Sequence, residues 1–280
     1  MISSKAKKSI VLRDITKLSE MREVEELQRQ VWGIDDLEVF PALALIPMRE
    51  VGAVLIGAFD REQLIGFVFG FPGYENGRGI LHSDMLAVKP EYRAHSLGYR
   101  LKLAQRERAI ANGIDTITWT FDPLQAVNAH LNIAKLGAIA DSYRVDYYGE
   151  TTSFLHGAGT DRLWATWSLT SDRVRQRIEP GETLPAPNLG DTPSLISVGE
   201  GDEPITAETD LDKQPVVIEI PGNIDSLFKQ SPALAIRWRE ATRQMFTKAL
   251  DSGYIVAEFF RLERNGRSSA RYLLISAAGK

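Results

Sequence analysis

The chain has 280 residues, of which 44% are hydrophobic and 25% are charged, as expected for an ordinary globular protein with one large or two modest domains. Lys and Arg number 33 and Asp and Glu 37, so the net charge is −4 and the broad positive field of a nucleic-acid binder is absent. The chain has no cysteine, which excludes disulfides, thiol nucleophiles and thiolate metal sites. Its four histidines are widely scattered, so no metal site is predicted.

Two features bear on where the protein works. The basic start of the chain is followed by the polar break at Arg13 and Asp14, too soon for the apolar region of a secretory signal. The longest apolar run, Val51 to Phe59, is interrupted by two glycines and is about half of the ~18 residues that span a bilayer. We therefore expect a cytoplasmic protein without a membrane partner.

The first part of the chain alternates between helical and strand patterns. A helix is predicted over 18–31, because five apolar residues recur there every three or four positions. Three strands follow over 51–59, 64–71 and 80–88, and then a helix over 97–111, a strand over 115–121 and a helix over 126–136. Two more strands are predicted over 139–148 and 162–169. The first three strands are joined by short polar turns, which predicts an antiparallel meander.

The composition changes sharply between Ile178 and Asp212. This stretch holds nine acidic residues, five prolines and no Lys or Arg, a composition typical of an extended and solvated connection. We therefore predict three parts: a domain over 1–172, an acidic linker over 173–213 and a small module over 214–280.

The C-terminal module has a β-α-β-β pattern. Its helix is marked by Ser231 and Pro232 at the start and Gly253 at the end, since Ser satisfies a free amide, Pro suits the first turn and Gly accepts a left-handed closing residue. The predicted strands cover 216–220, 254–261 and 271–275.

A strand, a proline, a basic loop and a helix start follow one another over 86–99. Such a junction directs several backbone N–H groups, and the positive end of the helix dipole, toward one point. It therefore suits a diphosphate or another anion. An ordinary structural turn is the alternative, because strand–loop–helix junctions with Arg and Gly are common.

This junction resembles the acyl-CoA-binding motif of the GNAT (Gcn5-related N-acetyltransferase) superfamily, Q/R-x-x-G-x-G/A after a strand ending in apolar-x-V-x-P. Arg93, Ser96 and Gly98 carry the pattern here, after Val88 and Pro90. The segment 128–138 resembles the family's second signature, a helix ending in K-x-G-F. With the order of elements, the resemblance covers about 10–170, and the chain is similar to a GNAT group described only as predicted acetyltransferases. It implies an α+β fold, a GNAT-like mixed sheet flanked by helices, with the small C-terminal β-α-β-β module attached.

The resemblance implies an acyl-CoA-dependent N-acyltransferase. We expect acetyl-CoA as the donor and direct transfer of its acetyl group to an amine on a small molecule or a protein. The pantetheine arm would lie along the strand and the diphosphate on the loop. Asn128 and Asn132 lie one helical turn apart, so both could face the cofactor. The cofactor-binding candidates are therefore Leu86, Ala87, Val88, Arg93, Ala94, His95, Ser96, Leu97, Gly98, Tyr99, Asn128 and Asn132. Helix caps and surface amides explain the asparagines almost as well.

Two departures from the family pattern affect the expected site. Ser96 stands where the family prefers Gly, so a Cβ approaches the phosphates while a hydroxyl can donate a bond in return. Ile133 stands four residues before the Gly of K-x-G, where the family often has a Tyr as general acid. The usual acid is therefore missing.

Three other residues are candidates for proton transfer. His82 and Asp84 are two apart on a predicted strand, hence on one face, and a histidine titrates near neutrality as a general base must. Asp122 follows a strand at the start of a helix, beside the expected cleft. The alternatives are a hydrogen-bonded strand histidine, an Asp84 that bonds a nearby loop, and an Asx turn at Asp122.

Two other functions remain open. Without the usual tyrosine, the same scaffold could be a noncatalytic module that binds CoA thioesters or docks a partner. Transfer from aminoacyl-tRNA on a similar fold is disfavoured, because the acidic balance offers no surface that attracts RNA. The C-terminal module would cover the acceptor cleft or mediate a homodimer.

Overall fold

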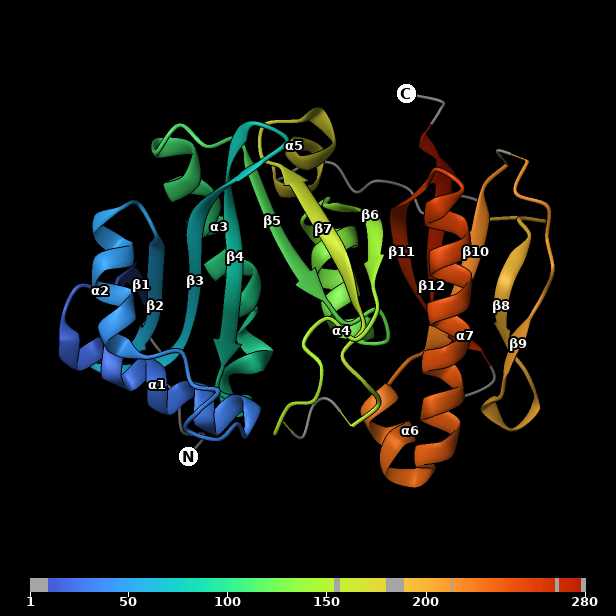
Figure 1. Ribbon diagram of the computed structural model, residues 1–280, viewed down its shortest axis with the longest axis horizontal. Helices are drawn as coiled ribbons and strands as arrows, with labels where there is room; N and C mark the ends of the chain where they lie inside the picture. Colours follow the sequence, from blue (N-terminus) through green and yellow to red (C-terminus); the bar gives the residue numbers. More distant parts are fainter. Residues whose placement is uncertain (1–9, 154–156, 180–188, 213, 265–266, 278–280) are drawn as a thin grey trace, which may run out of the picture. The chain divides into compact units, whose positions relative to one another are not determined.

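The computed structural model describes residues 10–153, 157–179, 189–212, 214–264 and 267–277 (Figure 1). Contacts divide the chain into two compact units, a first unit of Met1–Ile117 with Thr152–Phe154 and a second unit of Thr118–Thr151 with Leu155–Lys280. Both combine helices with strands, which confirms the predicted α+β class. No helix of the described residues has the length and apolar character needed to cross a membrane.

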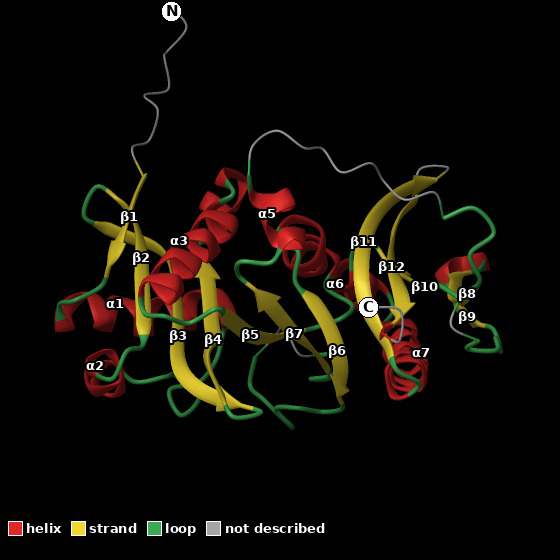
Figure 2. Ribbon diagram, turned by 90° about the horizontal axis from the view of Figure 1, so that it is seen from above, coloured by secondary structure: helices red, strands yellow, loops and turns green. Residues whose placement is uncertain are grey.

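The first unit is an antiparallel sheet with helices on both faces. Its strands lie in the order β1-β2-β3-β4. Helix α3 covers one face, and α1 and α2 cover the other (Figure 2). The elements are β1 (Ile10–Asp14), α1 (Leu18–Trp32), α2 (Ala42–Glu50), β2 (Val54–Asp60), β3 (Gln63–Glu75), β4 (Arg78–Val88), the 3₁₀ turn η1 (Pro90–His95) and α3 (Leu97–Ala111).

Most of these elements follow from the hydrophobic pattern. The stripe of α1 from Met21 to Val31 is buried against Phe67 and Phe69 of β3, and Gly33 ends the helix at a φ of 63°. The meander of β2, β3 and β4 is as predicted. The sequence did not indicate β1 or α2, because β1 has five residues and α2 contains Pro47.

The second unit continues from β5 (Thr116–Phe121), whose first two residues belong to the first unit. Its strand order is β5-β7-β6-β11-β12-β10-β8-β9, and the parallel pair β8–β10 among antiparallel pairs makes the sheet mixed. Its other elements are α4 (Ala126–Ala129), the π-helical turn η2 (His130–Lys135), β6 (Ile139–Arg144), β7 (Arg162–Ser168), α5 (Asp172–Ile178), β8 (Ser194–Val198), the 3₁₀ turn η4 (Glu200–Asp202), β9 (Pro204–Thr206), β10 (Val216–Pro221), α6 (Ile224–Gln230), α7 (Pro232–Asp251), β11 (Tyr254–Arg264) and β12 (Arg267–Ser276).

The β-α-β-β pattern of the C-terminal module is confirmed, with α6 as an extra short helix before α7. The hydroxyl of Ser231 accepts the Leu234 amide at the start of α7, as the end signals predict. The α7 stripe that includes Trp238 and Met245 is buried. Helix α7 packs along β6, β10 and β11.

The segment expected to be an extended linker is partly ordered. Helix α5 lies at its start, and β8 pairs with β10 and β9. The expectation of a solvated connection is wrong for these residues, because Leu195 and Ile196 of β8 are fully buried. The composition of the segment did not indicate β8, because five residues are enough to add a strand to the sheet. Residues 180–188 and 213 of the predicted linker lie outside the described residues, and the three predicted domain ranges stay predictions.

Candidate functional site

The strand β4 contains an irregularity next to two of the predicted site residues. Phe69 pairs with Met85 and Gly70 pairs with Ser83, so β4 has one residue more than β3 between these pairs, and that residue is Asp84. Such a bulge shifts the alternation of faces. Ser83 accordingly contacts α3, whereas Met85 packs in the core with α1 and α2.

The loop after β4 is held in place by its own side chains. The amide of Lys89 donates to the Ile65 oxygen at 2.9 Å, which keeps the end of β4 on β3. Buried Tyr92 donates its hydroxyl to Asp60 Oδ2 at 2.9 Å, which ties η1 to the turn between β2 and β3. His95 Nδ1 lies 3.3 Å from the Tyr92 oxygen. The loop is therefore anchored from beneath while its outer side is exposed.

Ser96 turns the chain from η1 into α3. Its backbone is left-handed, at φ 53° and ψ 29°, the conformation that explains why a Gly is favoured at this position of the motif. Its hydroxyl makes no capping hydrogen bond to α3, and no acidic residue lies in the first turn. The first helical bond runs from Arg100 to the Ser96 oxygen. The three amides between them lie where a helix offers no internal acceptor.

Other predicted binding residues surround this turn. Arg93 is exposed, and its Nε donates to the Val88 oxygen at 3.3 Å. Gly98 and Tyr99 are half-buried, and burial raises the pKa of Tyr99. Leu97 is fully buried, so of this residue only the backbone can meet a ligand. Ala94 lies in η1.

The strand residues predicted to line the pantetheine arm differ among themselves. Leu86 and Val88 are half-buried. Ala87 points the other way and is buried in the core cluster beneath α1 and α2. Ala87 can therefore offer a ligand only its backbone groups.

His82 lies on the side of the sheet that α1 and α2 cover. It pairs across the sheet with Phe71, and the two rings are 5.6 Å apart. Burial lowers the pKa of His82, and the positive charge of Lys102 lowers it further. A neutral imidazole at pH 7 is the form that can accept a proton.

Asp84 occupies the bulge, so its expected alternation with His82 is interrupted there. The Asp84 side chain reaches solvent, but the protein around its carboxyl partly desolvates it, and this raises the pKa of the carboxyl. The catalytic roles of His82 and Asp84 stay predictions. Both residues lie on β4 in the first unit: Asp84 is the bulge residue, and His82 lies two residues before it.

A buried polar cluster lies behind β4. Lys102 of α3 is only 2% exposed, and its Nζ donates to Ser83 Oγ and to Gln105 Oε1, both at 3.0 Å. Burial lowers the pKa of Lys102 to about 7. This cluster was not predicted from the sequence, although Lys102, Gln105 and Ala109 repeat at helical spacing beside the apolar stripe of α3 and could have indicated it.

In the second unit, Asp122 is bound on both oxygens. Oδ1 accepts the Leu124 amide at 2.8 Å, which confirms the Asx turn considered as the alternative. Oδ2 accepts from Arg239 Nη2 of α7 at 2.7 Å, and both side chains are almost completely buried. Catalysis by Asp122 stays a prediction; in the structure each of its oxygens accepts one hydrogen bond.

The two asparagines of the second unit lie in different surroundings. Asn128 is exposed in α4, whereas Asn132 is buried in the π-helical turn η2. The helix predicted over 126–136 is present from Ala126 to Lys135, but it is α-helical only over α4. It becomes π-helical at His130, which changes the angle between successive residues. Ile133, at the position of the missing tyrosine, is fully buried.

Residues 18–137 match the sequence model of the Acetyltransferase (GNAT) family. No curated protein matches the chain. Similar solved structures include the ribosomal-protein-S18-alanine N-acetyltransferase of Escherichia coli, with 12% identity, a TM-score of 0.46, and 63% of this chain and 99% of that one covered. An aminoglycoside 6'-N-acetyltransferase of Enterococcus faecium has 17% identity and a TM-score of 0.43, over 58% and 97% of the chains.

A third similar structure is a protein of Salmonella typhimurium solved with acetyl-CoA. It has 12% identity and a TM-score of 0.46, over 57% of this chain and 94% of that one. These values are too low to transfer a substrate or the role of a residue from any of the three.

Proposed function

We propose that this chain, in which residues 18–137 form a domain of the acetyltransferase (GNAT) family, is an N-acyltransferase that uses acetyl-CoA as acyl donor. The family match covers the segment with Arg93, Ser96 and Gly98 and supports the resemblance drawn from them. The observation that carries the proposal is the β4–η1–α3 junction, where the left-handed Ser96 opens the first turn of α3 beside exposed Arg93.

The residues of this junction fit a diphosphate. The first-turn amides, the positive end of the α3 dipole and the Arg93 guanidinium all favour an anion, and no acidic side chain of the first turn opposes it. The Ser96 hydroxyl is not used as a helix cap, so it can donate to a phosphate oxygen. Half-buried Leu86 and Val88 would contact the pantetheine arm.

The reaction is a direct transfer. The amine nitrogen attacks the thioester carbonyl, the C–N bond forms and the C–S bond breaks, and the products are an amide and the CoA thiolate, which takes a proton from water. His82, kept neutral by its surroundings, would take the proton of the amine. A strand N–H would polarise the acyl carbonyl. The acceptor is an amine of a small molecule or a protein.

Calorimetric titration with acetyl-CoA tests the donor site. We expect micromolar binding that Arg93→Glu weakens at least about tenfold, because a charge-assisted bond becomes a repulsion. Arg78→Glu is the matched control, since Arg78 is also exposed and lies at the opposite end of β4. A native chain that does not bind acetyl-CoA, or an equal loss in both variants, would contradict the proposal.

A noncatalytic CoA-thioester-binding module is the second candidate, favoured by one observation. The position of the usual tyrosine holds Ile133, which is fully buried and has no group to protonate a thiolate. Release of free thiol from acetyl-CoA in the presence of a panel of amines separates the two functions. Turnover that is lost in His82→Ala while acetyl-CoA binding persists supports the enzyme. Binding without turnover for every amine supports the module.

A further inference from the structure

We propose that a pocket between α4 and the β11–β12 hairpin is a second binding site, one that takes a small organic monocarboxylate. The pocket has a volume of ≈ 410 Å³, within the range of roughly 300–1,000 Å³ typical of small-molecule sites. All of its lining residues belong to the second unit, and none is among the residues predicted to bind acetyl-CoA. The inference therefore goes beyond the proposed acyl transfer and does not depend on it.

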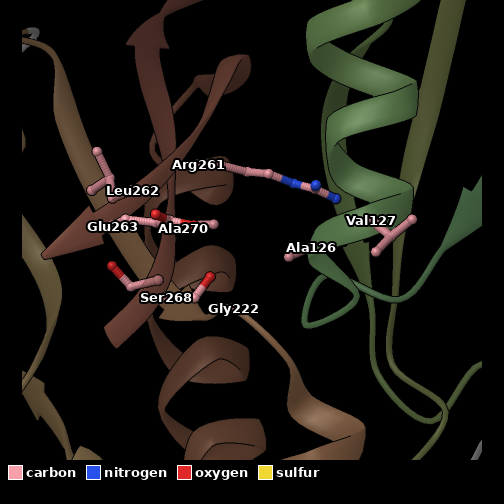
Figure 3. A pocket seen from close by; sticks show the side chains of 9 residues that line it. Ala126, Val127, Gly222, Arg261, Leu262, Glu263, Ser268 and Ala270 are labelled. Carbon is pink, nitrogen blue, oxygen red and sulfur yellow. The ribbon is translucent and has the colours of Figure 1, made fainter. Parts of the chain in front are cut away.

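Arg261 is the cationic side chain among the residues that line the pocket. Its side chain extends from β11 toward Ala126 and Val127 at the start of α4 (Figure 3). Across the described residues its guanidinium has no hydrogen bond and no ion pair, in contrast to Arg271 on the neighbouring strand, which pairs with Glu219. A planar guanidinium offers two parallel N–H donors that match a carboxylate.

The charge of Arg261 acts on a histidine of the same unit. Phe259, two residues earlier on β11, lies against His130, with 6.5 Å between the ring centroids. Burial lowers the pKa of His130, and the charges of Arg261 and Lys135 lower it further. The buried Nδ1 of His130 has no hydrogen-bond partner among the described residues. An anion bound to Arg261 would therefore weaken the effect of its charge on His130.

The rest of the pocket limits the ligand to one negative charge and a small body. Glu263 lies opposite Ser268 in the β11–β12 register, and its carboxylate would repel a second negative charge. Ser268 supplies a hydroxyl, while that of Ser269 is already bound to Glu219 at 2.6 Å. Small apolar side chains, Ala126, Val127 and Ala270, face the remaining volume.

The site is tested by calorimetry with lactate and propionate, two monocarboxylates of equal chain length that differ by one hydroxyl, and with inorganic phosphate as a more highly charged anion. We expect saturable lactate binding below about 10 mM, weaker binding of propionate and still weaker binding of phosphate. Arg261→Gln should weaken lactate binding about tenfold or more, because a charge-assisted pair is lost. Arg175→Gln, an exposed arginine of α5, should leave it unchanged.

A second readout follows the histidines by NMR, which is practical because the chain has only four. Lactate should raise the pKa of His130 in the native chain and not in Arg261→Gln, while His82 and His95 stay unchanged. Val127→Trp, at the exposed rim, should fill the pocket and abolish both effects without altering the fold. The proposal is overturned if lactate does not bind, if phosphate binds as tightly, or if acetyl-CoA displaces lactate.

Discussion

Each of the two units buries a cationic side chain, but the partners differ. In the second unit, Arg239 is bound to Asp122 at 2.7 Å. Burial alone would lower the pKa of Arg239, yet the charge and the hydrogen bond of Asp122, with Tyr143 and Asp161 behind it, raise it. In the first unit, Lys102 donates to the neutral oxygens of Ser83 and Gln105, and burial lowers its pKa to about 7.

This difference separates a structural charge from one that can change near neutral pH. A carboxylate partner fixes the proton on Arg239, so the pair connects α7 to the turn after β5 at any ordinary pH. Neutral partners leave the proton of Lys102 exchangeable, beside a strand that carries the candidate base His82. Three experiments test or sharpen this contrast, and a fourth tests the anchor of η1 in the same unit as Lys102.

The largest effect is expected from Asp122→Asn. The amide oxygen can still accept the Leu124 amide, but buried Arg239 loses the carboxylate it is paired with and keeps only the weaker influence of Asp161, which costs up to about 3–5 kcal/mol. Urea denaturation measures the free energy of unfolding. Asp172→Asn, which loses only an exposed pair at 3.7 Å, should change it by less than about 0.5 kcal/mol. A similar small change in Asp122→Asn would show that the buried pair is dispensable.

The stability of the native chain should depend on pH through Lys102. Between its folded pKa of about 7 and an unfolded value near 10.4, the unfolded chain binds more protons. The contribution of Lys102 to stability therefore rises with pH in this window, by at most about 1.4 kcal/mol per pH unit, and is lost as the pH falls toward 7. Lys102→Met should remove this rise in denaturation curves recorded from pH 6 to pH 10. Equal slopes in both proteins would refute a lowered pKa.

A smaller effect is expected from Tyr92→Phe. Loss of the bond to Asp60 should lower the free energy of unfolding by about 1 kcal/mol and weaken acetyl-CoA binding a few-fold, because η1 loses its anchor. Tyr74→Phe is the control, since Tyr74 is 86% exposed on the same sheet. Unchanged acetyl-CoA affinity in Tyr92→Phe would mean that the loop is held by its backbone alone.

The smallest effect concerns the pH profile of turnover. The positive charge of Lys102 lowers the pKa of His82, so Lys102→Met should move the acid limb of thiol release to higher pH. Arg108→Gln, an exposed residue of the same helix, should not move it. A profile that does not change in Lys102→Met would argue against His82 as the base.

Local signals made parts of this protein predictable. The stripe from Met21 to Val31, the caps at Ser231 and Gly253, and the meander around Asp60 each depend on neighbours in sequence, and the structure has these elements. The β4–η1–α3 junction was also located correctly, since Pro90 fixes its own φ and cannot continue the strand ladder. The π turn at His130 was not predicted, because α and π turns share the same residue preferences.

The sequence by itself determined the order of the main elements and the position of the candidate diphosphate loop, because periodicity, caps and turns act within a few residues. Only the tertiary structure decided which polar side chains have hydrogen-bond partners within the protein and which are exposed to solvent. Asp122 meets Arg239 across 117 positions and Lys102 meets Ser83 across 19. Hydration and charge depend on such distant neighbours. The spacing of residues along a helix can indicate that Lys102 is buried, but not which residue of another element it contacts.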